Sequence, residues 1–350
     1  MSTSTYGTTV QLSDAVVAWL VAGLPEAQPP FRLEPITGGY SMLTSRLIDE
    51  SGRTWVLRQP PPGQSSGRAH DPARESRTMA ALWDTPVPVP RVRMTGTADD
   101  PLGTPCHVTD YVDGPVLTDK ADAERLLDSD SMRVATTNLT TVLAALHAVD
   151  PEQIGLSDLG PAENYNGRQV HRWNSTLERL RETDAPDVAG RVTALRVIGD
   201  ELGTRLPADT SGRIVHGDYR LGNTITGTDG AIHAVLDWEL VTRGEPLADL
   251  GLLLTYWDAP AESMLGASSP TTARGSLTPD EVVSTYVDAS GRDVSALPIY
   301  RALACWRLSC MSLRTAARVG AGAMGTDSDP SPFLHTCDVW AEFAGEQLRG

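Results

Sequence analysis

The sequence predicts an α+β protein of two lobes, in which a five-stranded antiparallel sheet and a helix precede a larger, mainly helical part. Short apolar runs bounded by turn residues fill the N-terminal part of the chain and are typical of strands. From residue 131 onward the apolar residues recur at helical spacing. A chain of 350 residues also exceeds the usual size of a single core, so we expect one lobe over 1–112 and another over 113–350.

The first lobe contains two expected helices and five expected strands. Ser13 and Asp14 begin the first helix, and Pro25 stops it. The second helix has Asp71 as N-cap and Pro72 at its first position. Met79, Leu82 and Trp83 form its expected apolar face, the first helix covers 12–24, and the strands cover 31–37, 43–48, 54–57, 89–94 and 106–112.

The second lobe is expected to be helical, apart from a short apolar strand that begins at Ile214. Its first helix carries His147 near the C-terminal end, where a core histidine or one favoured by the helix dipole is the simplest interpretation. The apolar side of that helix should consist of Val134, Leu139, Val142, Leu143 and Leu146. The expected helices cover 131–149, 170–181, 187–206, 246–256, 278–289, 297–319 and 332–348.

The acidic composition argues against whole classes of partner. The 45 acidic and 29 basic residues give a net charge of −16, which disfavours broad binding to nucleic acid or to an acidic membrane. The four cysteines show neither a CxxC pair nor a zinc-binding spacing, so we expect reduced cysteines and a cytoplasmic protein. We expect no signal peptide, because residues 1–10 lack a basic region followed by an apolar run. We expect no membrane span, because no run of about 18 apolar residues occurs. A homodimer stays open.

Lysine is almost absent from the chain. Lys120 is the only one, so the Gly-Lys-Ser/Thr sequence of a P-loop cannot occur. Any phosphate contact that a lysine normally makes must therefore fall to arginine.

The stretch 214–223 carries the strongest chemical signal. A short apolar strand leads into a loop with Asp218, and Asn223 follows five residues later. A second apolar strand delivers another carboxylate, Asp237, fourteen residues after that amide. In phosphoryl transfer one such Asp accepts the proton of a hydroxyl, while the Asn and the second Asp hold Mg²⁺ against the phosphates of a nucleotide.

An arginine and a glutamate upstream suit the same chemistry. Arg58 ends the third expected strand, and Glu75 lies one turn into the next helix. An ion pair between them would hold the arginine ready for two phosphate oxygens, although each could also be a solvated surface charge.

Two backbone segments could contact the nucleotide as well. The Gly38-Gly39-Tyr40-Ser41 turn could place N–H groups over phosphates, and it could equally be a simple turn. Tyr111 and Val112, at the exit of the fifth strand, could meet an adenine edge or could form a plain linker.

These residues resemble the aminoglycoside phosphotransferase-like kinases, which have a two-lobed protein-kinase-like fold, over about 33–257. The resemblance implies ATP and Mg²⁺ as donor and cofactor, with Asp218 as catalytic base and Asn223 and Asp237 as magnesium ligands. It also implies that His216 and Asp249 are structural and support the loop. Gly38 to Ser41, Arg58 and Glu75 match the parts that hold the nucleotide.

A narrower resemblance concerns the branch associated with acyl-CoA dehydrogenases. It rests on residues 55–63 and 69–75 and on the Asn164-Tyr165, Arg168-Gln169 and Arg172-Trp173 pairs. In this branch arginine often stands where other kinases have lysine. The resemblance implies phosphorylation of a hydroxyacyl-CoA.

The acceptor is therefore expected to be a small molecule with a hydroxyl group, and a CoA ester is preferred. Arg307, Arg314 and Arg318 fall within roughly 20° of one line on a helix, and Arg168 and Arg172 are four residues apart. These arginines, except Arg318, are candidate contacts to an anionic substrate, together with Glu239, and solvated helix faces are the alternative.

An aminoglycoside, another small alcohol, a catalytically silent nucleotide- or CoA-binding module, and GTP instead of ATP all stay open. A protein kinase is disfavoured, because no Ala-Pro-Glu segment follows Asp237 and Pro246 comes only nine positions later.

Overall fold

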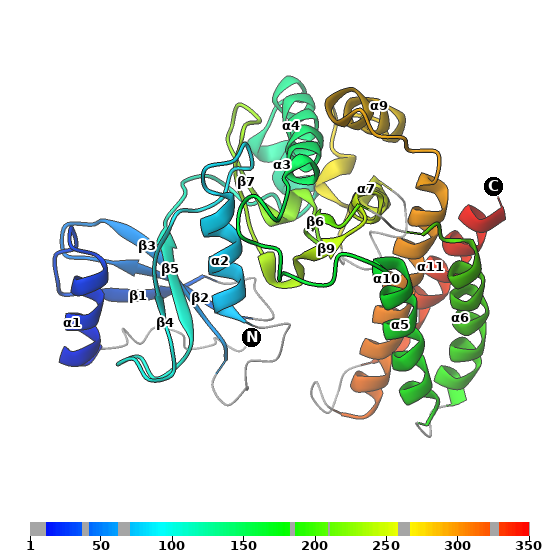
Figure 1. The fold of residues 1–350 in the computed structure, drawn as a ribbon, viewed down its shortest axis with the longest axis horizontal. Coiled ribbons are helices and arrows are strands. Elements are labelled where there is room, and N and C mark those ends of the chain that lie inside the picture. The colour runs from blue at the N-terminus through cyan, green and yellow to red at the C-terminus, as the bar shows by residue number, and fades with distance from the viewer. Residues whose placement is uncertain are drawn as a thin grey trace. The chain divides into compact units, whose positions relative to one another are not determined.

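In the computed structural model the described residues are 12–36, 42–61, 71–182, 186–208, 211–257, 267–322 and 329–349. The chain forms two compact units, one of Met1–Asp113 with Ala234–Leu240 and one of Gly114–His233 with Val241–Gly350. Figure 1 shows the sheet of the first unit and the helices of the second. The α+β class is confirmed. The functional division at residue 112 stays a prediction.

The first unit is built on the predicted five-stranded sheet, whose order is β1-β2-β3-β5-β4 with every neighbouring pair antiparallel. In the central strand, Arg58 lies opposite Thr44 on one side and His107 on the other. Arg58 therefore lies in the third strand, as expected, and the strand continues by one residue to Gln59. The strands are β1 (Arg32–Pro35), β2 (Leu43–Ile48), β3 (Thr54–Gln59), β4 (Val92–Gly96) and β5 (Cys106–Asp110).

The two faces of this sheet have different roles. Side chains alternate along a strand, so Trp55 and Leu57 lie in the buried core that helix α1 (Asp14–Gly23) covers. Arg58 falls on the opposite face by the same alternation. Asp71 caps helix α2 (Pro72–Leu82), as predicted, by accepting hydrogen bonds from the Ala73 and Arg74 amides.

Helix α2 packs against β4, β5 and the short helix η2 (Trp238–Leu240). The expectation that Trp83 belongs to its apolar face was wrong. Trp83 is the C-cap residue, it is 46% exposed, and the Arg91 guanidinium lies 5.6 Å from its ring centre.

The second unit is mainly helical, and helix α10 packs against α5, α6, α7 and α11. Two short sheets accompany the helices, β6 with β9 and β7 with β8. The helices are α4 (Ser129–Ala148), α5 (Tyr165–Arg181), α6 (Pro186–Arg205), α7 (Pro246–Leu254), α9 (Pro279–Ser290), α10 (Leu297–Gly320) and α11 (Ser331–Arg349). The short elements are β6 (Arg213–Val215), η1 (Leu221–Asn223), β7 (Thr224–Thr226), β8 (Ile232–Val235), β9 (Thr242–Gly244), η3 (Thr255–Trp257) and η4 (Pro270–Thr272).

Two details of this unit differ from expectation. Val134 is 44% exposed, because it lies about 140° around α4 from the buried Leu139 at roughly 100° per residue. Helix α3 (Lys120–Leu126), capped by Asp119, was not predicted, since its sequence is polar and only Ala123 is buried. None of the helices among the described residues has the length and apolar character needed to span a membrane.

The contact between α6 and α10 gives a test of the packing. Trp306 of α10 is fully buried, and its Nε1 donates to the Leu195 carbonyl oxygen at 2.8 Å. Trp306→Ala should lower the free energy of unfolding by about 3–5 kcal/mol in urea titrations followed by circular dichroism. Val197→Ala is the control, because Val197 is 64% exposed on the same helix α6, and it should change stability by less than about 0.5 kcal/mol. Equal effects of the two substitutions would contradict this packing.

Candidate active site

The loop after β6 is held by one buried carboxylate. The backbone amides of His216 and Gly217 donate to the two oxygens of Asp249, at 2.5 and 2.9 Å. Gly217 has a φ of +85°, a conformation that glycine adopts without steric cost. Asp249 lies in α7 and is 1% exposed, so the bracing expected of it is present in these contacts.

Asp249 is supported in turn by a buried histidine. His147 Nε2 lies 3.5 Å from Asp249 Oδ2, and His147 Nδ1 lies 2.7 Å from the hydroxyl of Tyr286. Burial raises the pKa of Asp249. The contacts with His147 and with the Gly217 amide together lower this pKa by more than burial raises it, so it lies below its usual value. His147 is thus a core histidine that stabilises an ionised carboxylate.

The carboxylate of Asp218 is oriented by three side chains. Asn223 Nδ2 donates to both the carbonyl oxygen and Oδ2 of Asp218, each at 2.8 Å. The Tyr256 hydroxyl donates to Oδ1 at 3.3 Å, and Arg220 Nε lies 3.8 Å from Oδ2. The predicted Asp218 and Asn223 are therefore in contact. Because the NH2 group of Asn223 donates to Asp218, its amide oxygen is the atom that can coordinate a cation.

Tyr256 and Arg220 are site residues that the sequence reasoning missed. Arg220 lies inside the loop motif, so its position could have been a signal. Tyr256 is 38 residues from Asp218, and no local pattern connects the two. Burial and the Asp218 carboxylate both raise the pKa of Tyr256, which keeps the phenol protonated as a hydrogen-bond donor.

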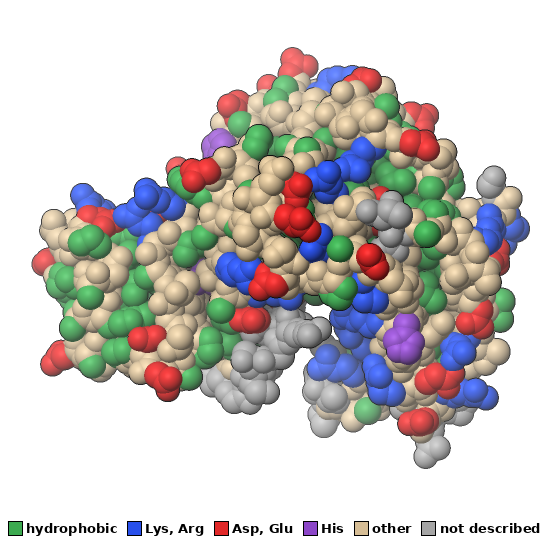
Figure 2. Space-filling model, in the orientation of Figure 1, with side chains coloured by type: hydrophobic (Ala, Val, Ile, Leu, Met, Phe, Trp, Pro, Cys, Tyr) green, Lys and Arg blue, Asp and Glu red, His purple; other side chains and the backbone are tan. Residues whose placement is uncertain are grey.

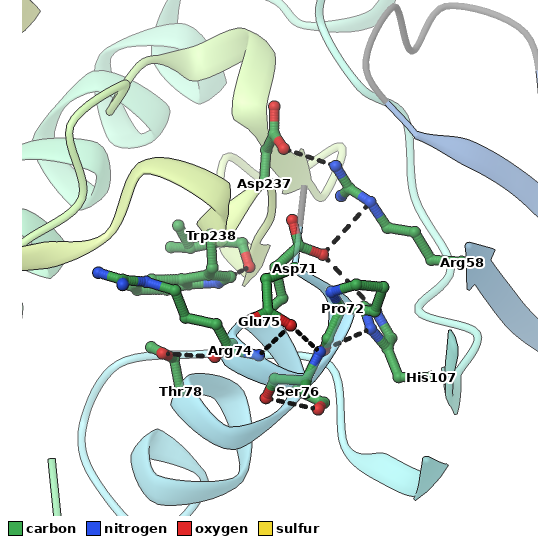
Figure 3. Close-up of polar contacts among 12 residues, drawn as sticks. Arg58, Asp71, Pro72, Arg74, Glu75, Ser76, Thr78, His107, Asp237 and Trp238 are labelled. Carbon is green, nitrogen blue, oxygen red and sulfur yellow. Dashed lines mark hydrogen bonds and ion pairs between the residues drawn. The ribbon is translucent and has the colours of Figure 1, made fainter. Parts of the chain in front are cut away.

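In the other unit, Arg58 contacts two carboxylates at once (Figure 3). Its Nε lies 3.4 Å from Glu75 Oε2, which confirms the predicted ion pair. Its Nη2 donates to Asp237 Oδ1 at 2.6 Å, a contact that was not predicted. Glu75 is 2% exposed, and His107 Nε2 lies 3.9 Å from its Oε2.

Three acidic groups gather beside this arginine. Oxygens of Glu75, Asp237 and Glu239 all lie within 4.8 Å of one another, an arrangement that can hold a metal ion. Burial raises the pKa of Glu75 to about 7; Arg58 lowers it, while Asp237 and Glu239 add to the rise. Burial lowers the pKa of His107 to about 4, so this histidine is neutral at pH 7.

The backbone at Asp237 is unusual. Its φ of +65° is left-handed, which among the described residues only Asn164 shares outside glycine. Trp238 secures the turn, because its ring is buried and its Nε1 donates to the Val235 carbonyl oxygen at 3.0 Å. Such a conformation costs free energy and is typical of functional positions.

The other predicted nucleotide contacts are only partly visible. Gly38, Gly39, Tyr40 and Ser41 lie outside the described residues. The Tyr111 hydroxyl accepts a hydrogen bond from Arg46 Nη2 at 3.1 Å, and Val112 lies two residues beyond the end of β5.

The predicted substrate arginines fall into two groups. Arg168 donates to the carbonyl oxygens of Pro161 and Glu163 and so ties α5 to the preceding loop. Arg172 and Arg314 lie beside the ring of Trp173, and Arg307 lies beside the loop that contains Gly217 and Asp218.

The fold and these contacts define a class of protein. An Asp–Asn loop, and an Arg–Glu pair on an antiparallel sheet and its helix, are the parts from which kinase-like phosphotransferases are built.

Comparison with known proteins gives the family. The sequence profile of the phosphotransferase enzyme family matches residues 32–290, so the chain belongs to this family. A Ralstonia eutropha structure assigned to the aminoglycoside phosphotransferases has a TM-score of 0.80 and 27% identity, covering 96% of this chain and 98% of that one. The complex of APH(2″)-IIa with streptomycin and ATP shares the fold, with a TM-score of 0.59 and 15% identity, covering 87% of this chain and 91% of that one.

The curated relatives are longer proteins. Acyl-CoA dehydrogenase family member 11 of Gallus gallus is 29% identical over 289 residues, which are 80% of this chain and 36% of the relative. The human protein of the same name is 29% identical over 298 residues, 82% of this chain and again 36% of the relative. The chain thus spans about a third of the length of the curated relatives it matches. The predicted family and its acyl-CoA dehydrogenase-associated branch are confirmed.

The bracing of the loop can be tested by removing its acceptor. Asp249→Ala should lower the free energy of unfolding by about 3–5 kcal/mol, because two buried amides lose their acceptor. Thermal and urea unfolding measure the change. Asp130→Asn, at an exposed position in the same unit, should change stability by less than about 0.5 kcal/mol. A variant at 249 as stable as this control would contradict the role of Asp249.

Glu75 should make stability depend on pH. Its folded pKa of about 7 exceeds the ordinary 4.5, so its contribution favours folding below pH 4.5 and is lost as pH rises to about 7. The loss is about 3 kcal/mol at roughly 1.4 kcal/mol per pKa unit. Between pH 5 and pH 8 the wild type should therefore lose more stability than Glu75→Gln. Glu34→Gln, at a side chain 44% exposed, should keep the wild-type dependence. Parallel pH profiles of the wild type and Glu75→Gln would rule out a titrating Glu75.

Proposed function

We propose that this chain transfers the γ-phosphoryl group of ATP, bound with Mg²⁺, to a hydroxyl group of a small molecule. The observation that carries the proposal is the fixed Asp218 carboxylate, held by Asn223 and Tyr256 in a loop that Asp249 braces. Membership of the phosphotransferase enzyme family supports the reaction class. ATP as donor is supported by the related structure that contains ATP, and GTP remains the alternative.

In this mechanism Asp218 is the general base. Its carboxylate accepts the proton of the acceptor hydroxyl as the oxygen attacks the γ-phosphorus, and the bond from that phosphorus to the bridging oxygen breaks to release ADP. The hydrogen bonds from Tyr256 and Asn223 fix the direction of the carboxylate.

The metal ligands we propose are Asn223 and Asp237. The residues present suit Mg²⁺, because they offer amide and carboxylate oxygens. Glu75 Oε1 is buried without a hydrogen-bond partner in the described part of the chain, and it belongs to the group of carboxylates around Asp237. When bound, Mg²⁺ neutralises charge on the phosphates of the donor.

Arg58 is proposed to bind phosphate oxygens while Glu75 holds its guanidinium in place. The segments at 38–41 and 111–112 complete the proposed nucleotide contacts, and His216 and Asp249 are structural. His216 contributes through the loop, since its Nδ1 accepts a hydrogen bond from the Asp218 amide at 3.3 Å.

The acceptor we prefer is a hydroxyacyl-CoA. The relatives named acyl-CoA dehydrogenase family member 11 support it, because that name refers to acyl-CoA compounds. An aminoglycoside or another small alcohol is the second candidate. It is supported by the assignment of the Ralstonia eutropha structure and by the net charge of −16, which suits a cationic ligand.

A turnover assay tests the reaction and its base together. The chain is incubated with ATP, Mg²⁺ and a panel of hydroxyacyl-CoAs, sugars, choline-like alcohols and aminoglycosides, and phosphorylated product is measured by mass spectrometry. Asp218→Asn should reduce turnover by at least about 10²–10⁴-fold, because the general base is lost. EDTA should abolish turnover, and Asp130→Asn should leave it unchanged.

Two results would overturn the proposal. Wild-type turnover of no alcohol in the panel, with nucleotide binding intact, would identify a silent binding module. Full turnover by Asp218→Asn would remove Asp218 from the mechanism.

A further inference from the structure

Two packed helices carry an excess of arginine in an acidic chain. Helix α5 contains four arginines and a single acidic residue, Glu178, which pairs with Arg196 of α6. Helix α10 contains four arginines and no Asp or Glu. Since the chain as a whole has a net charge of −16, this local excess needs a reason other than composition.

The arginines gather around a buried tryptophan. The guanidinium carbons of Arg172 and Arg314 each lie 5.7 Å from the ring centre of Trp173. Trp173 is 4% exposed, and its Nε1 has no hydrogen-bond partner among the described residues. The two arginines themselves are exposed. Figure 2 shows basic side chains gathered over α5 and α10.

No acidic side chain of the described segments forms an ion pair with Arg172, Arg307 or Arg314. Partial burial lowers the pKa of Arg172, and the neighbouring Arg307 and Arg314 lower it further. Partial burial also lowers the pKa of Arg314, with added effects of Arg318 and Arg179. Like charges without acidic partners repel one another, so a bound anion would stabilise this group.

We name Arg172, Arg179, Arg307, Arg314 and Arg318 the arginine ridge. Its inner end lies at the catalytic loop, because Arg307 Nη2 donates to the carbonyl oxygen of Gly217 at 3.4 Å, next to Asp218. Arg314 and Arg318 follow on nearly the same line of α10, about 10 and 16 Å farther along the axis at roughly 1.5 Å per residue. The ridge therefore leads away from the proposed base.

Arg168 does not belong to the ridge. Its guanidinium donates hydrogen bonds to the carbonyl oxygens of Pro161, Glu163 and Arg243, and it therefore stabilises the backbone around α5. Of the substrate arginines predicted from the sequence, the structure thus separates Arg168 from Arg172, Arg307 and Arg314.

We propose that the arginine ridge binds the phosphate groups of the acceptor, at the end of the molecule remote from the hydroxyl that reacts. This inference rests on the proposed function and deepens it. It requires an elongated acceptor with several phosphates about 10–16 Å from the reacting end, which is the chemistry of a CoA thioester. Arginine suits this task, because its planar fork contacts two phosphate oxygens at once.

Binding without turnover tests the ridge directly. Isothermal titration of the full chain with CoA and with pantetheine, which lacks the phosphates, separates the two ends of the ligand. CoA should bind the wild type at least about tenfold more tightly than pantetheine. The double variant Arg172→Ala/Arg314→Ala should weaken CoA binding at least about tenfold and leave pantetheine unchanged.

Controls make the result specific. Arg125→Ala changes an arginine that is 64% exposed and paired with Asp122 in α3, and CoA binding should not change. Arg314→Lys keeps the charge and loses the fork, so it should lie between the wild type and Arg314→Ala. Circular dichroism confirms that each variant is folded. CoA affinities equal in the double variant and the wild type, or CoA and pantetheine binding equally, would overturn the ridge.

The outcome is independent of catalysis. Asp218→Asn should bind CoA with wild-type affinity, because the base does not contact the phosphates. If the wild type transfers no phosphoryl group but binds CoA through the ridge, the proposed function fails and the ridge stands. If the double variant phosphorylates a hydroxyacyl-CoA with an unchanged KM, the ridge fails and the function stands.

Discussion

The loop that carries Asp218 depends on one buried carboxylate. Asp249 accepts hydrogen bonds from the backbone amides of His216 and Gly217, two donors that no neighbouring strand pairs with. The free-energy cost of burying the Asp249 carboxylate is offset only because both of its oxygens accept hydrogen bonds. The contact of His147 with Asp249, and of Tyr286 with His147, extends the network into α4 and α9. The position of Asp218 is thus set by the backbone, and Asn223 and Tyr256 only orient its side chain. In the proposed role of Asp218 as the base, a carboxylate held in this way would lose little entropy when a substrate binds.

In the other unit, too, one group holds several partners, because a single guanidinium forms ion pairs with two carboxylates. The fork of Arg58 reaches Glu75 with Nε and Asp237 with Nη2, at 3.4 and 2.6 Å. A lysine ammonium is a point charge and could not present two fixed donors in one plane. The absence of lysine here is therefore compatible with an ordered clamp. Glu239 leaves the group with more negative than positive charge, which is the condition under which a cation binds.

What the sequence could predict was local. The cap at Asp71, the limits of β2 and the pairing of Arg58 with Glu75 depend on neighbours along the chain or on adjacent elements. The contact of Arg58 with Asp237 joins residues 179 positions apart, and nothing in either neighbourhood specifies it. The predicted burial of Val134 was wrong and helix α3 was missed for another reason. Which helix face is buried, and whether a polar segment is helical, depend on the elements that pack against them. The motif 216–223 was recognisable because catalysis and bracing require fixed residue types at fixed spacing.

The net charge of the chain and the local charge on α5 and α10 have opposite signs. A net charge of −16 acts at long range as a repulsion of polyanions, but screening limits it to about 8 Å at physiological salt. The arginine ridge lies on two helices that together hold one acidic residue, so a ligand that reaches the ridge meets a positive surface. Under the proposed function, such a surface would suit a small anion with its phosphates at one end better than nucleic acid, whose charge is spread along its length. Composition alone favours a cationic substrate only weakly, and the distribution of the arginines is the reason that we propose an anionic one.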